Sequence, residues 1–192
     1  CTITENTASW DGGGLNIYAA TVTMTDCTIS QNTANTHNGG GLWIDQVSLV
    51  TMASCTVTAN AAGSSGAGLH IEASAIVTMS SCIISENTAS RGGGLYIQGS
   101  ATMTMTDCAI SENTGSNDGG GMAIYGSATV SMTHCTISKN LAASGGGGGL
   151  LIDVGTVAMT SCTISENTAT GGGGIYLYSG TVHLTGCVFS SN

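Results

Sequence analysis

The chain has 192 residues, of which only 7% are charged, and its formal net charge is −9. Arg91 and Lys139 are its only basic side chains, so it lacks the clustered positive charge that nucleic-acid binding needs. Apolar residues are too regularly spaced for a disordered chain, and no apolar run approaches the roughly 20 residues of a membrane-spanning helix. We therefore expect a folded segment that neither binds nucleic acid nor inserts into a membrane.

One unit recurs along the whole chain. A cysteine returns after about 27 residues, at Cys1, Cys27, Cys55, Cys82, Cys108, Cys135, Cys162 and Cys187. An asparagine follows each cysteine five residues later, at Asn6, Asn32, Asn60, Asn87, Asn113, Asn140, Asn167 and Asn192. A repeat of this length is typical of a solenoid, in which one unit stacks on copies of itself. We expect an all-β parallel β-helix (a β-solenoid) of about seven coils.

Each unit begins with a short strand such as Cys27-Thr28-Ile29-Ser30. Period-two alternation places the cysteine and the isoleucine inside and the hydroxyl side chains outside. The asparagine that follows is then buried, and a buried amide needs hydrogen-bond partners. Identical amides one coil above and below supply them. We therefore interpret the asparagines as a structural ladder.

The segment between the asparagine and the glycines varies from unit to unit, as in 88–91 and 114–118. We expect a corner of the coil there. Glycine runs such as Gly12-Gly13-Gly14 supply the positive φ angles and the close backbone approach that a corner needs.

A second strand follows the glycines, as in 42–44, and its first and third residues are always apolar. Its middle residue points outward, and four of these are the aromatic residues Trp43, His70, Tyr96 and Tyr176. The next outward column carries carboxylates, including Asp45 and Glu72. A sugar stacks its apolar face on exposed rings, so the four residues are candidate glycan-binding residues. Two alternatives are lateral contact with another rod and isolated surface aromatics at positions that suit a strand.

The third strand reads Thr-Val-Thr-Met-Thr at 21–25, with Val22 and Met24 pointing inward. Its outward threonines in successive units include Thr23, Thr25, Thr51, Thr78, Thr104 and Thr106. Hyperactive insect antifreeze proteins look similar, with Thr-x-Thr on one face of a β-helix, so these are candidate ice-binding residues. The alternative is that threonine simply suits a solvated strand. Leu49 and Ile76 interrupt the grid.

One residue separates the third strand from the next cysteine, as at Asp26 and Ser54, and it breaks the alternation in every unit. A break at a fixed place indicates a second corner. We therefore expect three short strands in each coil.

The repeats resemble those of the chlamydial polymorphic outer-membrane proteins and related autotransporter passengers. Gly93-Gly94-Leu95-Tyr96 is similar to their Gly-Gly-aliphatic motif. Phe189-Ser190-Ser191-Asn192 is similar to their Phe-x-x-Asn motif, in which isoleucine replaces phenylalanine at 84–87. The resemblance implies a right-handed, single-stranded β-helix that is exposed at the cell surface and often adhesive.

Stacked cysteines about 4.8 Å apart lie within the range for disulfides between neighbouring coils. An extracellular setting would permit such bridges. The interpretation that we favour is a column of buried free thiols. No Cys-x-x-Cys pair is present and His134 stands alone beside Cys135, so we expect no metal site and no cofactor.

Enzymes with this fold, such as pectate lyases and polygalacturonases, cluster aspartates and add a basic group. Here Asp26 and Asp107 lie about three coils apart. No paired carboxylates share a face at the distance that hydrolases use. We expect no catalytic residues and no enzymatic activity.

We interpret residues 1–192 as one β-solenoid segment, excerpted from a longer repeat protein. The expected role is structural: a rigid shaft, an adhesin stalk or a filament building block of a secreted or cell-surface protein. Its partners would be neighbouring coils or further copies of itself, bound end to end or laterally. Glycan binding and ice binding are the alternatives.

Overall fold

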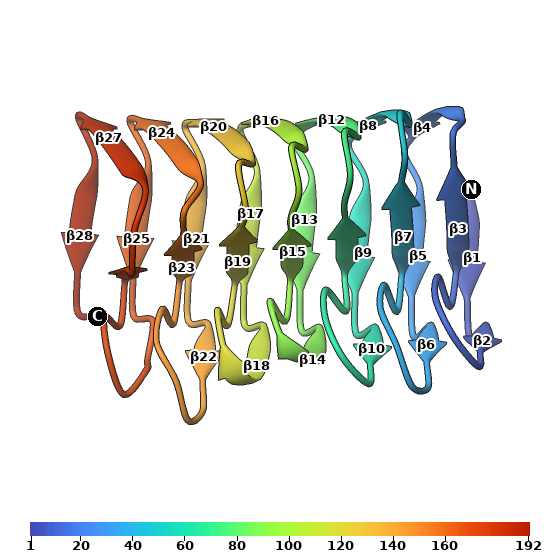
Figure 1. Cartoon of the computed structure of the whole chain (residues 1–192), viewed down its shortest axis with the longest axis horizontal. Coiled ribbons are helices and arrows are strands. Elements are labelled where there is room, and N and C mark those ends of the chain that lie inside the picture. Colours follow the sequence, from blue (N-terminus) through green and yellow to red (C-terminus); the bar gives the residue numbers. More distant parts are fainter.

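The computed structural model describes all 192 residues as a single rod of stacked coils, with the two termini at opposite ends (Figure 1). Every strand pairs in parallel with the equivalent strands of the coils before and after it. The structure contains strands and turns only. None of its elements is a helix with the length and apolar character that spanning a bilayer takes. The predicted all-β parallel solenoid is confirmed.

The strand after each cysteine belongs to an eight-stranded sheet, here called the isoleucine sheet. Its strands are β1 (Thr2–Thr4), β5 (Thr28–Ser30), β9 (Thr56–Thr58), β13 (Ile83–Ser85), β17 (Ala109–Ser111), β21 (Thr136–Ser138), β25 (Thr163–Ser165) and β28 (Val188–Ser190). Equivalent residues pair directly, as Ile84 does with Ile110. The predicted stacking of like on like therefore holds along this sheet.

The second strand of each unit forms a seven-stranded sheet, here called the aromatic sheet. Its strands are β3 (Leu15–Tyr18), β7 (Leu42–Asp45), β11 (Leu69–Ile71), β15 (Leu95–Ile97), β19 (Met122–Tyr125), β23 (Leu150–Asp153) and β26 (Ile175–Leu177). Its arrows point opposite to those of the isoleucine sheet in Figure 1, because the two sheets are facing walls of each coil.

The third strand forms another seven-stranded sheet, here called the threonine sheet. Its strands are β4 (Thr21–Thr25), β8 (Leu49–Ala53), β12 (Ile76–Ser80), β16 (Thr102–Thr106), β20 (Thr129–Thr133), β24 (Thr156–Thr160) and β27 (Thr181–Thr185). All five residues of each strand pair in register, for example Thr78 with Thr104. This sheet lies along the upper edge of the rod in Figure 1.

The variable segment contains a short fourth strand in most coils, which the sequence did not predict. This corner sheet consists of β2 (Thr7–Ala8), β6 (Thr33–Ala34), β10 (Ala61–Ala62), β14 (Thr88–Arg91), β18 (Thr114–Asp118) and β22 (Leu141–Ala142). Its backbone groups find partners in neighbouring coils, as when the Thr114 N–H donates to the Asn87 carbonyl of the preceding coil at 2.9 Å. The pairing therefore follows from stacking rather than from local propensity.

Four positions in each coil turn the backbone through the left-handed region: the residue before the cysteine, the residue before the asparagine, one residue between the aromatic and threonine sheets, and the glycine three residues before each strand of the aromatic sheet. The corner predicted before each cysteine is confirmed, with φ of 50° at Asp26 and 51° at Ser81. A second turn, which was not predicted, lies at the residue before each asparagine, such as Glu86 with φ of 58°. The predicted positive φ is found at one glycine of each coil, such as Gly119 with φ of 59°, and close approach explains glycines after it, since a Cβ on Gly121 would lie 2.7 Å from the Gly149 carbonyl oxygen.

A continuous apolar core fills the rod from one end to the other. It contains 37 buried residues, most of them in columns of identical or similar side chains. Met52 pairs with Met79 on the threonine sheet, and Ile97 pairs with Ile124 on the aromatic sheet. Because the same side chains recur in every coil, each coil buries its apolar residues against the next without any charged group.

The asparagine ladder predicted from Asn6 to Asn192 is present in the structure. The Asn113 amide nitrogen donates to the Asn140 side-chain oxygen and to the Ile84 carbonyl, both at 3.0 Å. The backbone N–H of Asn113 also donates to the Asn140 side-chain oxygen at 3.0 Å. Each amide therefore joins the coil on either side of it.

All eight cysteines are free thiols, and six of them are buried. The Cys82 thiol donates to the Ser80 carbonyl at 3.3 Å and accepts from the Cys55 backbone N–H at 3.5 Å. A hydrogen bond with the neighbouring Cys135 thiol and burial raise the pKa of Cys108 to about 11. The Cys108 thiol is therefore protonated at neutral pH.

Candidate functional site

The outer face of the aromatic sheet carries two parallel columns of side chains. One column contains the residues at the middle of each strand, and the second contains those two positions later. The first column is Asn16, Trp43, His70, Tyr96, Ala123, Leu151 and Tyr176, and the second is Tyr18, Asp45, Glu72, Gln98, Tyr125, Asp153 and Tyr178. Inward-pointing Leu and Ile residues between them hold the strands on the core. Aromatic rings and carboxylates are thereby interleaved on one face.

The rings on this face stack on one another along the rod. His70 and Tyr96 have ring centroids 4.9 Å apart with planes 14° apart, and Tyr96 and Tyr125 are 5.2 Å apart. Tyr18 and Trp43 form a separate, wider pair at 6.5 Å. Offset stacking of this kind contributes about 0.5–1.5 kcal/mol for each pair beyond the area it buries.

The expected exposure of the aromatic column is wrong for two of its four members. His70 and Tyr96 are only 2% and 7% exposed, whereas Trp43 is half-buried and Tyr176 is 38% exposed. Neighbouring rings cover the faces of His70 and Tyr96. Alternation predicted which way these side chains point, but it carries no information on what lies over them.

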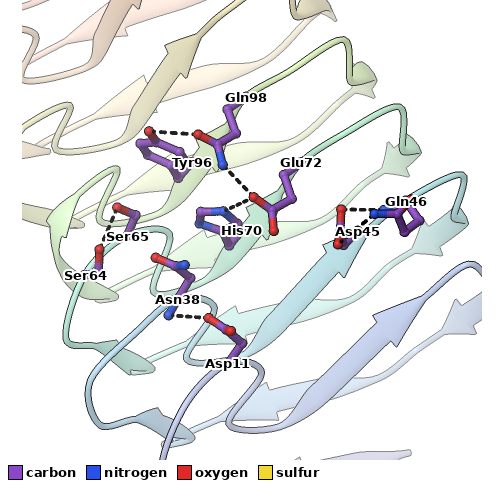
Figure 2. Close-up of polar contacts among 10 residues, drawn as sticks. All are labelled: Asp11, Asn38, Asp45, Gln46, Ser64, Ser65, His70, Glu72, Tyr96 and Gln98. Carbon is purple, nitrogen blue, oxygen red and sulfur yellow. Dashed lines mark hydrogen bonds and ion pairs between the residues drawn. The ribbon is translucent and has the colours of Figure 1, made fainter.

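The loops before the aromatic sheet also lie against this column. The backbone of Gly146 packs on the Tyr176 ring. A Cβ at this position would lie 2.6 Å from the ring, so only glycine fits there. Side chains tie successive loops together: Asp11 accepts from the Asn38 backbone N–H at 2.9 Å (Figure 2). The loops therefore form one wall beside the aromatic column.

A polar network lies on top of the stacked rings (Figure 2). The Glu72 carboxylate accepts from Gln98 Nε2 at 2.5 Å and from His70 Nε2 at 3.4 Å. The Tyr96 hydroxyl donates to Gln98 Oε1 at 3.3 Å. The hydrogen bond from His70, and a further one from Gln98, lower the pKa of Glu72 against the opposing effect of burial. Glu72 is therefore a fixed negative charge at neutral pH.

Two buried polar atoms on this face have no hydrogen-bond partner, namely Trp43 Nε1 and His70 Nδ1. With its proton on Nε2, His70 presents Nδ1 as an acceptor, whereas Trp43 Nε1 can only donate. A hydroxyl or a water molecule can satisfy either kind of atom, because it both donates and accepts. No hollow opens beside them, because the one surface pocket is at the last coil, around Phe189 and Asn192.

Two tyrosines of this face, Tyr96 and Tyr125, are neutral hydrogen-bonding groups. Burial is the largest cause that raises the pKa of Tyr96, with Arg91 opposing it and Glu72 adding to it. Burial and the neighbouring Asp118 raise the pKa of Tyr125 to about 12. Both phenols stay protonated at neutral pH and therefore present hydroxyl groups.

The outer face of the threonine sheet differs from the aromatic face in its exposure and its charge. Thr23, Thr51, Thr78 and Thr104 form one in-register column and are exposed. Thr25 is exposed and Thr106 is half-buried in the next column. No Asp, Glu, Lys or Arg occupies an outward position of this sheet. The structure thus gathers the six threonines on one uncharged face, while their binding of ice stays a prediction.

Several residues of the aromatic face were missed in the sequence. Gln98 links Glu72 to Tyr96, and Asp118 and Arg91 act on the tyrosines from the corner sheet. Gln98 stands two positions after Tyr96, where the carboxylates of other coils stand, and that spacing was a usable signal. Arg91 and Asp118 carried none, because their segment has no fixed length.

A protein-family comparison matches the model described as a right-handed β-helix region over residues 1–116 and 41–192. The two matches together cover the chain. The chain belongs to the right-handed β-helix family. Neither the comparison with curated proteins nor the comparison with solved structures gave a match. The family assignment establishes the hand of the coil, and it leaves the function to the chemistry of the faces.

Proposed function

We propose that this β-helix is a rigid structural segment, a shaft or filament building block, of a secreted or cell-surface protein. The observation that carries the proposal is the unbroken register of the three long sheets. Each coil repeats the same pairing and the same buried columns, so a bend would have to break several ladders at once. The only irregularity in pairing is a register shift between Ala89 and Arg91 in the corner sheet.

The composition of the outer faces supports an extracellular position. Ser, Thr and Asn occupy most outward positions in place of charged residues, and the chain carries two basic residues in all. We propose further copies of the same rod, end to end or side by side, as its partners. On this proposal the segment has no catalytic role, and its faces serve contact.

Electron microscopy of the parent protein, together with surface proteolysis of intact cells, tests this proposal. A straight shaft of constant width, digested from outside the cell, is expected. A compact particle without a shaft, or complete protection until the cells are lysed, would contradict it.

Ice binding is a second candidate, favoured by the uncharged, in-register threonine sheet. The exposed hydroxyls repeat about every 4.8 Å along the rod and about every 6.7 Å along a strand. Thermal hysteresis of the purified chain tests it, with Thr104→Tyr expected to lower the effect. Thr136→Tyr on the exposed surface of the isoleucine sheet is the matched control and should leave hysteresis unchanged. Ordinary freezing of the unsubstituted chain would remove this candidate.

Glycan binding by the aromatic face is a third candidate, and it rests on the accessible rings of Trp43 and Tyr176 beside the column of carboxylates. A glycan array with the Trp43→Ala variant tests it. Trp10→Ala is the control, since Trp10 is 66% exposed, stacks on His37 and stands outside the aromatic column, in the loop before β3. Binding that survives Trp43→Ala would contradict a sugar site here.

A further inference from the structure

The cysteine column places eight thiols at equivalent positions of successive coils. The Cys55 N–H donates to Cys82 Sγ at 3.5 Å, and the Cys82 N–H donates to Cys108 Sγ at 3.4 Å. The strands on either side are paired in register, so the sulfur atoms repeat with the coil, about every 4.8 Å. Cys55, Cys82 and Cys108 are at most 2% exposed.

This spacing is wide for a disulfide and suits a bridging ion. A Cα spacing of about 4.8 Å falls within the range of a disulfide, but the bond needs sulfurs about 2.05 Å apart, so parallel side chains would have to turn toward one another. Two metal–thiolate bonds of about 2.3 Å, the length found for zinc, place the sulfurs about 4.6 Å apart when the ion lies between them in a line. The gap between neighbouring coils therefore accommodates an S–metal–S unit with little movement.

The donor set restricts which ions fit. No three His, Cys, Asp or Glu side chains gather as ligands around one point, so an ion that needs four ligands is not accommodated. Thiolate sulfur selects soft ions. A parallel column of methionine thioethers, also soft donors, shares the same core. These features favour a monovalent soft cation with two ligands.

We propose that the cysteine column binds soft monovalent cations, Cu⁺ or Ag⁺, each held between the sulfurs of two neighbouring coils. Each ion displaces one thiol proton, R–SH + M⁺ → R–S–M + H⁺, and the same sulfur lies beside the next ion. The column then gains no net charge, which the apolar core requires. Eight thiols leave seven gaps, so seven ions would release seven protons.

Titration of the reduced chain with Ag⁺ in chloride-free buffer tests the proposal. The expected result is about seven bound ions for each chain, one proton released for each ion, and an unchanged β-sheet circular dichroism spectrum. Binding of two ions or fewer, or loss of the β-sheet spectrum as ions bind, would overturn it. Fewer than eight reactive thiols in the denatured, unreduced protein would also overturn it, because the sulfurs would then be paired as disulfides.

Single substitutions separate the column from other donors. Cys108→Ser removes a sulfur that borders two gaps, so about five ions should bind. Met105→Leu removes a neighbouring thioether and leaves every thiol in place, so about seven ions should still bind. If Cys108→Ser does not fold, Cys82→Ser carries the same expectation. An ion count that Cys→Ser substitution leaves unchanged would refute the cysteine column as the site.

Discussion

The asparagine column and the cysteine column both run the length of the interior, on opposite sides of the isoleucine strands. The Asn113 amide nitrogen donates to both neighbouring coils, and its side-chain oxygen accepts from the preceding one, so every polar atom of the amide is used. The thiols make weak contacts to backbone groups and to neighbouring thiols, and no disulfide joins them. The same stacking thus satisfies every hydrogen-bonding group of the asparagine column, whereas the cysteine sulfurs keep unused capacity to bind a ligand.

The difference lies in the side-chain chemistry. A carboxamide carries a donor and an acceptor and is therefore complementary to a copy of itself one coil away. A thiol is a weak donor and a weak acceptor, so a copy of itself satisfies little of its capacity. We infer that the amides fix the register between coils and that the thiols mainly fill space and keep coordinating capacity.

The largest expected effect comes from breaking the amide ladder. Asn113→Ala leaves the Ile84 carbonyl and two donors of Asn87 without partners in the core. Each buried group left without a partner costs about 1–3 kcal/mol, so the free energy of unfolding should fall by about 4 kcal/mol. Urea denaturation measures it, with the exposed Asn6→Ala as the control at about 1 kcal/mol. Equal losses at the two positions would show that the ladder does not fix the register.

Backbone approach beside the ladder gives the next largest effect. A Cβ on Gly93 would meet the Thr114 carbonyl carbon at 2.6 Å, whereas one on Gly171 would meet only the edge of the Tyr176 ring at 3.4 Å. Gly93→Ala should destabilise the chain by about 2–3 kcal/mol and Gly171→Ala by less than about 0.5 kcal/mol. Thermal denaturation compares them, and a harmless Gly93→Ala would mean that neighbouring coils are farther apart than described.

A smaller effect is expected in the cysteine column. Cys108→Ala removes one buried sulfur and with it the weak acceptor of the Cys82 backbone N–H at 3.4 Å, whereas Asn113→Ala orphans three groups, so the loss should be about 2 kcal/mol. Urea denaturation of the Cys108→Ala and Asn113→Ala variants under the same conditions compares their free energies of unfolding. A loss as large as that of Asn113→Ala would show that the thiols, too, determine the stacking.

The smallest effect concerns the outer face. The lowered pKa of Glu72 means that the folded state favours its ionised form. The ionised Glu72 side chain therefore stabilises the folded state above the unfolded-state pKa near 4.3. This stabilisation is lost as the pH falls through the lower folded-state pKa. The stability difference between the unsubstituted chain and Glu72→Gln, below about 1 kcal/mol, should therefore shrink below pH 4. A difference that stays constant from pH 7 to pH 3 would contradict the network with His70 and Gln98.

The residues of the interior were predictable because the Cys and Asn positions of the unit of about 27 residues recur eight times. Alternation around Ile29 and Met24 determined which residues point inward, and the repeat determined what lies above them. The strand Thr7–Ala8 was not predictable, because two residues have no period and pair only once coils stack. The burial of His70 and Tyr96 was missed because it depends on Tyr125 and the loops, which do not repeat.

The central claim is that equivalent residues of successive coils stack in register. A crystal structure at a resolution that shows each asparagine side chain tests it most directly. The stacked register predicts the Asn113 amide nitrogen about 3.0 Å from the Asn140 side-chain oxygen, with Ile84 opposite Ile110 in parallel strands. A slip of one residue in any of the three long sheets would turn such inward columns to the outside, and that result, or antiparallel pairing, would contradict the account.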